Sequence, residues 1–167
     1  MSERNDYRRT ISHVKTGLTK GTTSTYTTTA TSECSIDGKW ATGLTAQTNT
    51  ATPTTDARTS AAFVAQTDNT AAAYVFGITA AGAIAVCQGP IEATETGVTT
   101  TAGAFKNRPQ FPALPDNFCP IGYLFVRTAP SASDFTFGTS NWDATGVTSS
   151  AVVEVDGTLP DRPQALP

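Results

Sequence analysis

Apolar and polar positions alternate along residues 22–36. Odd positions from 23 to 31 are all threonine, and the even positions include four less polar side chains: Tyr26, Ala30, Cys34 and Ile36. A period of two is typical of a strand with one buried face, and β-branched threonine suits a pleated surface. The pattern therefore predicts one half-buried strand over residues 22–36 with a hydroxyl-rich outer face, followed by a turn at Asp37-Gly38.

A second pattern predicts a β-hairpin between residues 72 and 87. Ala72, Tyr74, Phe76 and Ile78 would share one face of its first strand, and the apolar run 84–87 would be its return. Residues 80–83 form the turn, where Gly82 can adopt a positive φ. Pro90 ends the pairing, because proline has no N–H to donate to a central strand.

The remaining segments predict two loops and two more strands. The polar segment 41–60, with Pro53 inside it, reads as a loop, and four prolines make 109–120 an extended connector rather than a sheet element. Residues 121–126 are apolar on both faces, which predicts a central strand covered on both sides. The segment 147–155 alternates and predicts one strand, with these residues on one face: Val147, Ala151, Val153 and Val155.

Short strands separated by turns, without a helix longer than two turns, predict an all-β fold. We expect an antiparallel β-sandwich or barrel, jelly-roll-like, with an extended N-terminal arm and a Pro-rich C-terminal tail. The expected division is an arm over 1–21, a β-sandwich body over 22–158 and an extended tail over 159–167.

Charge separates the arm from the body. Residues 1–20 have a balance of +3 and the rest of the chain a balance of −6. The arm has few aliphatic residues, namely Ile11, Val14 and Leu18 beyond Met1, so it cannot make a core of its own. We interpret it as a segment that orders on a partner; a solvated tail is the alternative.

Composition predicts a small core. The 167 residues include 32 threonines and 24 alanines, whereas Leu, Ile, Val and Phe together number 30. Only 15% of residues are charged, so solubility depends on hydroxyl groups. A partner that binds only the folded state adds stability by mass action, and we therefore expect oligomerisation or docking on a larger assembly.

Few residues suggest chemistry. His13 is the single histidine, and no CxxC, HExxH, P-loop or GxGxxG motif occurs, so we expect no enzyme, cofactor or metal site. The carboxylate pairs Glu92/Glu95 and Asp134/Asp143 lack the aromatic platforms of a glycosidase. Cys34, Cys87 and Cys119 are widely spaced and odd in number, which favours reduced thiols over one bridge plus a free thiol.

Other partner classes are weakly supported. No apolar stretch approaches the length that spans a bilayer, and the first residues lack the apolar core of a signal peptide, so we expect synthesis in a cytosol-like compartment. Nucleic acid is disfavoured because acids interrupt the basic leader and the body is acidic. Three aromatic residues are candidates for a carbohydrate site in which their rings stack on a sugar: Trp40, Trp142 and Tyr123.

Four stretches, in order, carry a resemblance: VAQTDNTAAAYVFGITAAGAIAVCQGPI, FPALPDNFCPIGYLFVRT, FTFGTSNWDATGVTSSAVVEVDG and LPDRPQ. Their shared features are an Ile-Asp-Gly-Lys turn from Ile36, a hairpin ending in Gln88-Gly89, a Pro-Ile-Gly-Tyr segment from Pro120, and a Phe-Gly-Thr loop before Gly-Val-Thr. Together they resemble a loose family of small β-rich virion proteins of tailed bacteriophages, over about 130 residues from Ile36 onward.

This resemblance implies a structural virion protein without known catalytic residues, made in the cytoplasm of a host bacterium. We expect a capsid decoration (cement) protein that binds the major capsid protein on the capsid surface, and that forms homo-trimers first and dimers second. A tail, baseplate or fibre component and a carbohydrate-binding adhesion module are the alternatives. The expected contact residues are Arg4, Tyr7, Arg8, Arg9, Ile11, Lys15 and Lys20, with extended contacts at Pro109, Pro112, Pro115 and Arg162.

Overall fold

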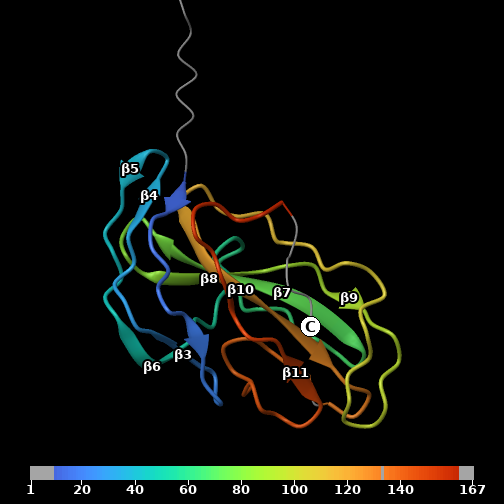
Figure 1. The fold of residues 1–167 in the computed structure, drawn as a ribbon. Coiled ribbons are helices and arrows are strands. Elements are labelled where there is room, and N and C mark those ends of the chain that lie inside the picture. The colour runs from blue at the N-terminus through green and yellow to red at the C-terminus, as the bar shows by residue number, and fades with distance from the viewer. Residues whose placement is uncertain (1–9, 133, 162–167) are drawn as a thin grey trace, which may run out of the picture.

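The computed structural model describes residues 10–132 and 134–161, which form an all-β body without a helix (Figure 1). The main sheet has six antiparallel strands: β7 (Thr70–Thr79), β8 (Ile84–Gln88), β9 (Glu92–Ala93), β10 (Phe118–Thr128), β11 (Val147–Ser149) and β12 (Val153–Glu154). Its order is β11-β10-β7-β8, with β12 also paired to β10 and β9 to β7.

Two smaller antiparallel sheets pack against the main sheet. One contains β1 (Ile11–Ser12), β4 (Cys34–Ile36) and β5 (Lys39–Trp40), and the other β2 (Thr19–Lys20), β3 (Thr25–Thr28) and β6 (Gln47–Ala51). Their orders are β1-β4-β5 and β2-β3-β6. The predicted antiparallel sandwich is confirmed, and the sheets do not close into a barrel.

The central strands β7 and β10 are buried on both faces, which the apolar run 121–126 predicted for β10 and the pattern of 72–78 did not predict for β7. Tyr74 and Phe76 of β7 contribute to a cluster beneath the smaller sheets, whereas Val75 contributes to a second cluster on the opposite face. Phe111 and Leu114 of the connector help to cover that second face. The predicted hairpin is also confirmed, and Gly82 in its turn has φ of 77°.

Residues 22–36 form two strands in different sheets, so the prediction of one strand is wrong. The alternation of burial is nevertheless as predicted, because Tyr26, Cys34 and Ile36 are buried and the odd positions are half-buried or exposed. Between β3 and β4 the backbone hydrogen-bonds to the segment between β1 and β2 instead of continuing the β3–β6 ladder: the N–H of Thr29 donates to the carbonyl of Thr16. This change of partner transfers the chain from one small sheet to the other.

Two other strand predictions need correction. The loop predicted over 41–60 contains β6, whose sequence QTNTA is largely exposed and therefore has no apolar alternation. The strand predicted over 147–155 is interrupted where the N–H of Ser150 donates to the carbonyl of Phe125. As a result, Val147 packs on the first cluster and Val153 on the second, rather than on one face.

The connector prediction is wrong at its end, because Phe118–Pro120 belong to β10. Pro120 lies in an interior strand opposite Gly77, where a register shift between Pro120 and Gly122 interrupts the ladder. A bulge tolerates proline in a sheet, because it leaves a position without a ladder hydrogen bond.

The body begins earlier than the predicted boundary at residue 21. β1 and β2 pair with β4 and β3, and the Leu18 side chain is only 2% exposed. The Glu154 carboxylate accepts hydrogen bonds from the N–H groups of Gly17 (2.6 Å) and Leu18 (3.1 Å). Residues 10–21 are therefore part of the sandwich rather than of an arm, because sheet partners and a buried leucine fix them.

The three cysteines are free thiols, as predicted, and all are buried. Burial and the charge of Asp56 raise the pKa of Cys87 from 9.0 to about 12, and burial raises the pKa of Tyr74 above its ordinary value. Above pH 9 the unfolded chain releases protons that the folded chain keeps, so unfolding becomes more favourable as pH rises.

We therefore expect the free energy of unfolding to fall between the ordinary thiol value of 9.0 and a pH of about 12. Urea unfolding over that range measures the slope. Cys87→Ala should make the slope shallower from its lower end, and Tyr74→Phe should do so above the ordinary phenol value of 10.0. Slopes equal to that of the unsubstituted chain would contradict the assignment to these two groups.

Candidate functional site

A groove of about 750 Å³, here called the terminal groove, lies where the described chain starts and near where it ends. Its lining comes from four places in the sequence: Thr10, the β4–β5 hairpin, the connector before β10, and Leu159. The residues before Thr10 and those after Asp161 are outside the described structure. The terminal groove therefore lies beside the points where leader and tail join the body.

Backbone hydrogen bonds hold the walls of the terminal groove together. Ser12 and Gly157 exchange two, with N···O distances of 2.8 and 2.9 Å, which tie the first strand to the segment after β12. The N–H of Asp37 donates to the Thr10 hydroxyl at 3.2 Å, and this bond fixes Thr10 to the hairpin turn. These contacts bring segments about 150 residues apart in sequence to the same edge.

The β4–β5 hairpin carries Trp40 directly after Lys39, a residue that lines the terminal groove, but on the opposite face of the hairpin. Asp37 and Gly38 both have positive φ, 52° and 72°, as a tight two-residue hairpin turn requires. Trp40 follows on the edge strand and is 68% exposed. An exposed tryptophan is uncommon on a solvated surface and typical of the centre of a protein interface.

The Trp40 ring is held in place although it faces solvent. The His13 ring stacks on it, with centroids 5.3 Å apart and an angle of 11° between the planes. The Nε2 atom of His13 lies 3.1 Å from the Ser35 hydroxyl oxygen, which anchors the histidine to β4. Because the indole is already ordered, a partner that binds it loses less side-chain entropy.

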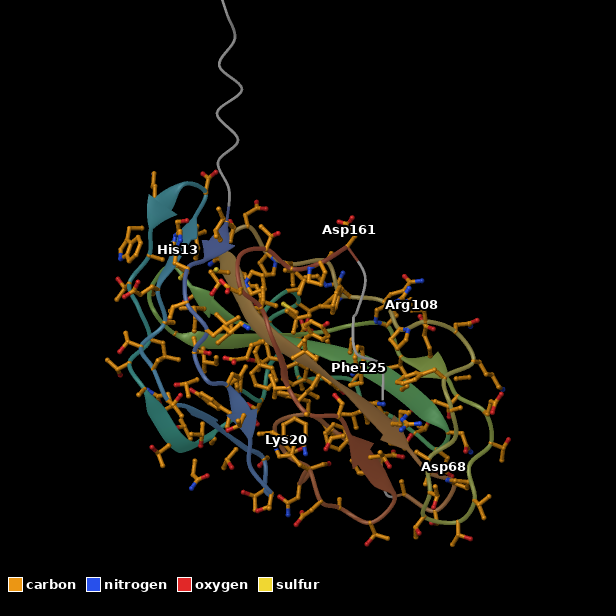
Figure 2. All side chains as sticks on the ribbon, viewed as in Figure 1. His13, Lys20, Asp68, Arg108, Phe125 and Asp161 are labelled. Atoms are coloured by element: carbon orange, nitrogen blue, oxygen red, sulfur yellow. The ribbon has the colours of Figure 1, made fainter. Side chains whose placement is uncertain are left out.

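Of the leader residues predicted to contact a partner, the structure describes three: Ile11, Lys15 and Lys20. Five other predicted contact residues lie outside the described residues: Arg4, Tyr7, Arg8, Arg9 and Arg162. Ile11 is half-buried in β1 opposite Ser35, and Lys15 is exposed. Figure 2 shows Lys20 at the end of the body away from His13, because β2 carries it there. Lys20 therefore lies away from the terminal groove, and the partner contacts predicted for Ile11 and Lys15 stay predictions.

The predicted proline contacts also lie in different places. Pro115 lines the terminal groove, Pro112 lines a second cavity, and Pro109 is buried. The terminal groove is not predictable from the sequence, because its walls meet only in the folded chain. The Asp37-Gly38 turn followed by Lys39-Trp40 was the available signal for an aromatic side chain at a hairpin tip.

Two of the three aromatic residues that the sequence offers for a carbohydrate site are in the core. Trp142 packs edge-on against Phe137, and its indole N–H donates to the Thr25 carbonyl at 3.1 Å. Tyr123 is 1% exposed in the second cluster. A sugar platform built on these two rings is thus excluded, which leaves Trp40 alone at the surface.

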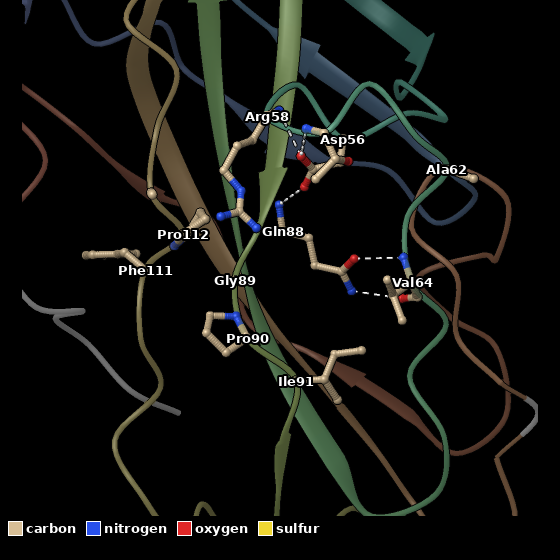
Figure 3. A pocket seen from close by; sticks show the side chains of 12 residues that line it. Asp56, Arg58, Ala62, Val64, Gln88, Gly89, Pro90, Ile91, Phe111 and Pro112 are labelled. Atoms are coloured by element: carbon tan, nitrogen blue, oxygen red, sulfur yellow. Dashed lines mark hydrogen bonds between the residues drawn. The ribbon is translucent and has the colours of Figure 1, made fainter.

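A second cavity, here called the Arg58 cavity, has a volume of about 390 Å³ (Figure 3). Apolar side chains make most of its wall, among them Val64, Ile91, Phe111 and Pro112. The guanidinium of Arg58 extends between the end of β8 and Pro112. Within the described part of the chain, that guanidinium makes no hydrogen bond or ion pair.

Two buried polar side chains shape the Arg58 cavity. The Asp56 carboxylate accepts hydrogen bonds from the N–H groups of Arg58 (2.8 Å), Thr59 (3.0 Å) and Gln88 (2.7 Å). The Gln88 amide accepts from the Val64 N–H at 2.9 Å and donates to the Val64 carbonyl at 2.8 Å. These bonds fix the loop from residue 56 to residue 64 against the end of β8.

Residues 10–132 and 134–161 contain no group of three or more His, Cys, Asp or Glu side chains placed to hold a metal ion. The same residues include no helix long and apolar enough to cross a membrane. His13, the single histidine of the chain, contacts Ser35 and Trp40.

Comparison of the chain with known protein families, with curated proteins and with solved structures finds no match in any of the three.

Proposed function

We propose that this protein is a capsid decoration protein of a tailed bacteriophage, which binds the outer shell and bridges neighbouring major capsid protein subunits. The resemblance of the chain from Ile36 onward to small virion proteins suggests the class. The single observation that best supports a docking role is the terminal groove. It is lined by Thr10, Pro115 and Leu159, one from each of the three segments that the sequence marks as contact segments, and the exposed Trp40 follows Lys39 of its lining.

In this proposal the protein acts through binding energy alone. Trp40 enters an apolar recess on the shell, and the basic leader lies along an acidic stretch of a neighbouring subunit. Many such contacts are repeated by the symmetry of the shell, so modest individual affinities add up to a stable coat. Binding also stabilises the decoration protein, whose own core is small.

Two alternatives remain for comparison. A tail, baseplate or fibre component would share the β-rich fold, but the chain has no repeated β-units or heptads of the kind that assemble fibres. A carbohydrate-binding module would have to use Trp40, because the other two candidate rings are buried. A glycan array with the unsubstituted protein and Trp40→Ala distinguishes this second alternative from capsid binding.

The proposal is tested by binding to bare, expanded capsids of the virus that encodes the chain. Trp40→Ala is expected to weaken binding about tenfold or more, as truncation of an interface hot spot does. Deletion of residues 2–9 is expected to weaken binding and to reduce its salt dependence, because it removes three arginines against two acidic residues, a net charge of +1. The deletion stops before Thr10, so the sandwich is left intact.

Lys20→Ala is the matched control, because Lys20 lies at the end of the body away from the terminal groove. It should bind capsids like the unsubstituted protein. Copy number per particle is an independent measurement: hundreds of copies support a shell component, and a handful of copies would contradict the decoration proposal. Unchanged binding of both Trp40→Ala and the deletion would show that another surface meets the shell.

A further inference from the structure

The Arg58 cavity is a preformed site with an unusual combination of features. Its shape depends on Asp56 and Gln88, whose side chains are buried and bonded to backbone groups of the walls. The same bonds hold Val64 at the rim, where it is 66% exposed. A fixed apolar rim that remains in contact with water is costly for an isolated chain, and such patches mark contact surfaces.

The electrostatics of the Arg58 cavity favour an anionic group. Three N–H donors already satisfy the Asp56 carboxylate, whereas the Arg58 guanidinium has no partner in the described chain. Arg58 is exposed beside a mostly apolar wall, and a guanidinium can bind a carboxylate there through two charge-assisted hydrogen bonds. The complementary ligand therefore carries an exposed apolar side chain with a carboxylate close to it.

The chain itself offers one surface of this kind. Among the described residues the exposed large apolar side chains are Trp40, Val64 and Val98. Val64 belongs to the Arg58 cavity, and Trp40 adjoins Lys39, whose charge has the same sign as that of Arg58. Val98 is 75% exposed, and residues 92–104 around it contain Glu92 and Glu95 but no lysine or arginine.

The turn that carries Val98 is rigid enough to act as a ligand. Val98 and Thr101 exchange two backbone hydrogen bonds, of 3.0 and 2.8 Å. The N–H of Gly97 donates to the Asn69 side-chain oxygen at 2.9 Å, and the Ser131 hydroxyl donates to the Thr99 carbonyl at 2.6 Å. Val98 is thus held outward, and none of the described residues of the chain covers it.

We propose that copies of this protein bind one another by inserting the 97–101 turn of one copy, with Val98 at its tip, into the Arg58 cavity of the next, where Glu95 pairs with Arg58. The two surfaces belong to different parts of the chain, so every copy provides one of each. Such a head-to-tail contact closes into a ring when the rotation permits. The inference goes beyond the proposed function and does not depend on capsid binding; it agrees with the homo-oligomer that we expect from the sequence.

One such contact buries less area than the 1,200–2,000 Å² or so of a typical stable interface, so we expect weak association that ring closure strengthens. Sedimentation velocity from micromolar to millimolar concentrations should show a closed oligomer for the unsubstituted chain. Arg58→Glu and Glu95→Arg should each raise the dissociation constant about tenfold or more, because each places like charges together at the contact.

The double variant, Arg58→Glu with Glu95→Arg, restores opposite charges in exchanged positions and should associate again. Lys106→Glu is the matched control, since it makes the same charge change at an exposed position outside the Arg58 cavity, and it should associate normally. Circular dichroism of each variant verifies that the sandwich is folded. Val98→Asp tests the apolar half of the contact and should also weaken association.

Three results would overturn the inference. They are an unsubstituted chain that stays monomeric at millimolar concentration, single variants that associate like the unsubstituted chain, and a double variant that associates no better than its parents. Trp40→Ala should leave self-association unchanged while it weakens capsid binding. Failure of the self-contact is thereby distinguishable from failure of the proposed shell contact.

Discussion

Replacement of Phe137 by alanine is expected to lower the free energy of unfolding by about 3–5 kcal/mol, the range typical of a fully buried phenylalanine. Phe137 is completely buried in the first cluster. Its ring centroid lies 4.6 Å from that of Tyr74 and 5.3 Å from that of Trp142. The variant loses these contacts and leaves a cavity between residues that rigid strands hold in place.

Urea unfolding followed by tryptophan fluorescence measures the loss, because Trp142 contacts the ring that is removed. Phe111→Ala is the matched control. Phe111 is only half-buried over the second face, so its truncation should cost clearly less. If both variants lost the same free energy of unfolding, the burial of the phenylalanine would not determine the cost of its removal.

The same variant connects stability with the proposed function. A small domain has about 5–15 kcal/mol of net stability, so a loss of this size leaves many molecules partly unfolded. Binding of the folded form to capsids stabilises it by mass action. Phe137→Ala should therefore bind capsids at lower apparent affinity, and the bound molecules should resist thermal unfolding better than the free ones.

The second large effect is expected for Gln66→Met, at about 2–4 kcal/mol, because the buried Val126 carbonyl loses a donor and the buried Tyr74 hydroxyl loses the acceptor for its proton. Gln66 is fully buried; its amide N–H donates to the Val126 carbonyl at 3.1 Å, and its amide oxygen accepts from the Tyr74 hydroxyl at 2.9 Å. Methionine has a similar shape but cannot make either bond, so the variant removes polar partners without opening a large cavity.

Equilibrium unfolding in urea measures this loss, and amide hydrogen exchange locates it. Exchange should become faster around Phe135, whose backbone bridges to Gln66 in both directions. Gln110→Met is the control, because Gln110 is exposed and its substitution should change stability little. A Gln66→Met variant as stable as that control would show that water or a shifted side chain replaces the lost partners.

The strands with the strongest periodicity were predictable from sequence. The hairpin of β7 and β8 and the central strand β10 combine aromatic and β-branched residues with a clear period, and burial of β10 on both faces follows from its apolar run. Alternation also predicted which side of residues 22–36 is buried. These features depend on the residues themselves and on their nearest neighbours.

Edges and interruptions were not predictable in the same way. The polar strand β6 lies at a sheet edge, where neither face needs apolar residues, so no pattern marks it. The break at Ser150 and the early start of the body depend on bonds to distant residues, to Phe125 in one case and to Glu154 in the other. A pattern read along the chain contains no information about such partners.

For the candidate sites, the sequence by itself determined which segments and charges are present: a basic leader, a proline connector, an Asp-Gly turn before Trp40 and an acidic body. It also showed a small hydrophobic core, which favours binding to a partner. Tertiary structure decided which of these segments meet. Sheet pairing places Lys20 at the end of the body away from His13. Tertiary packing buries Trp142 and Tyr123 and brings Thr10, Pro115 and Leu159 to one groove. The physical reason is that local propensity acts between neighbours along the chain, whereas a binding surface is assembled by long-range hydrogen bonds and packing between segments far apart in sequence.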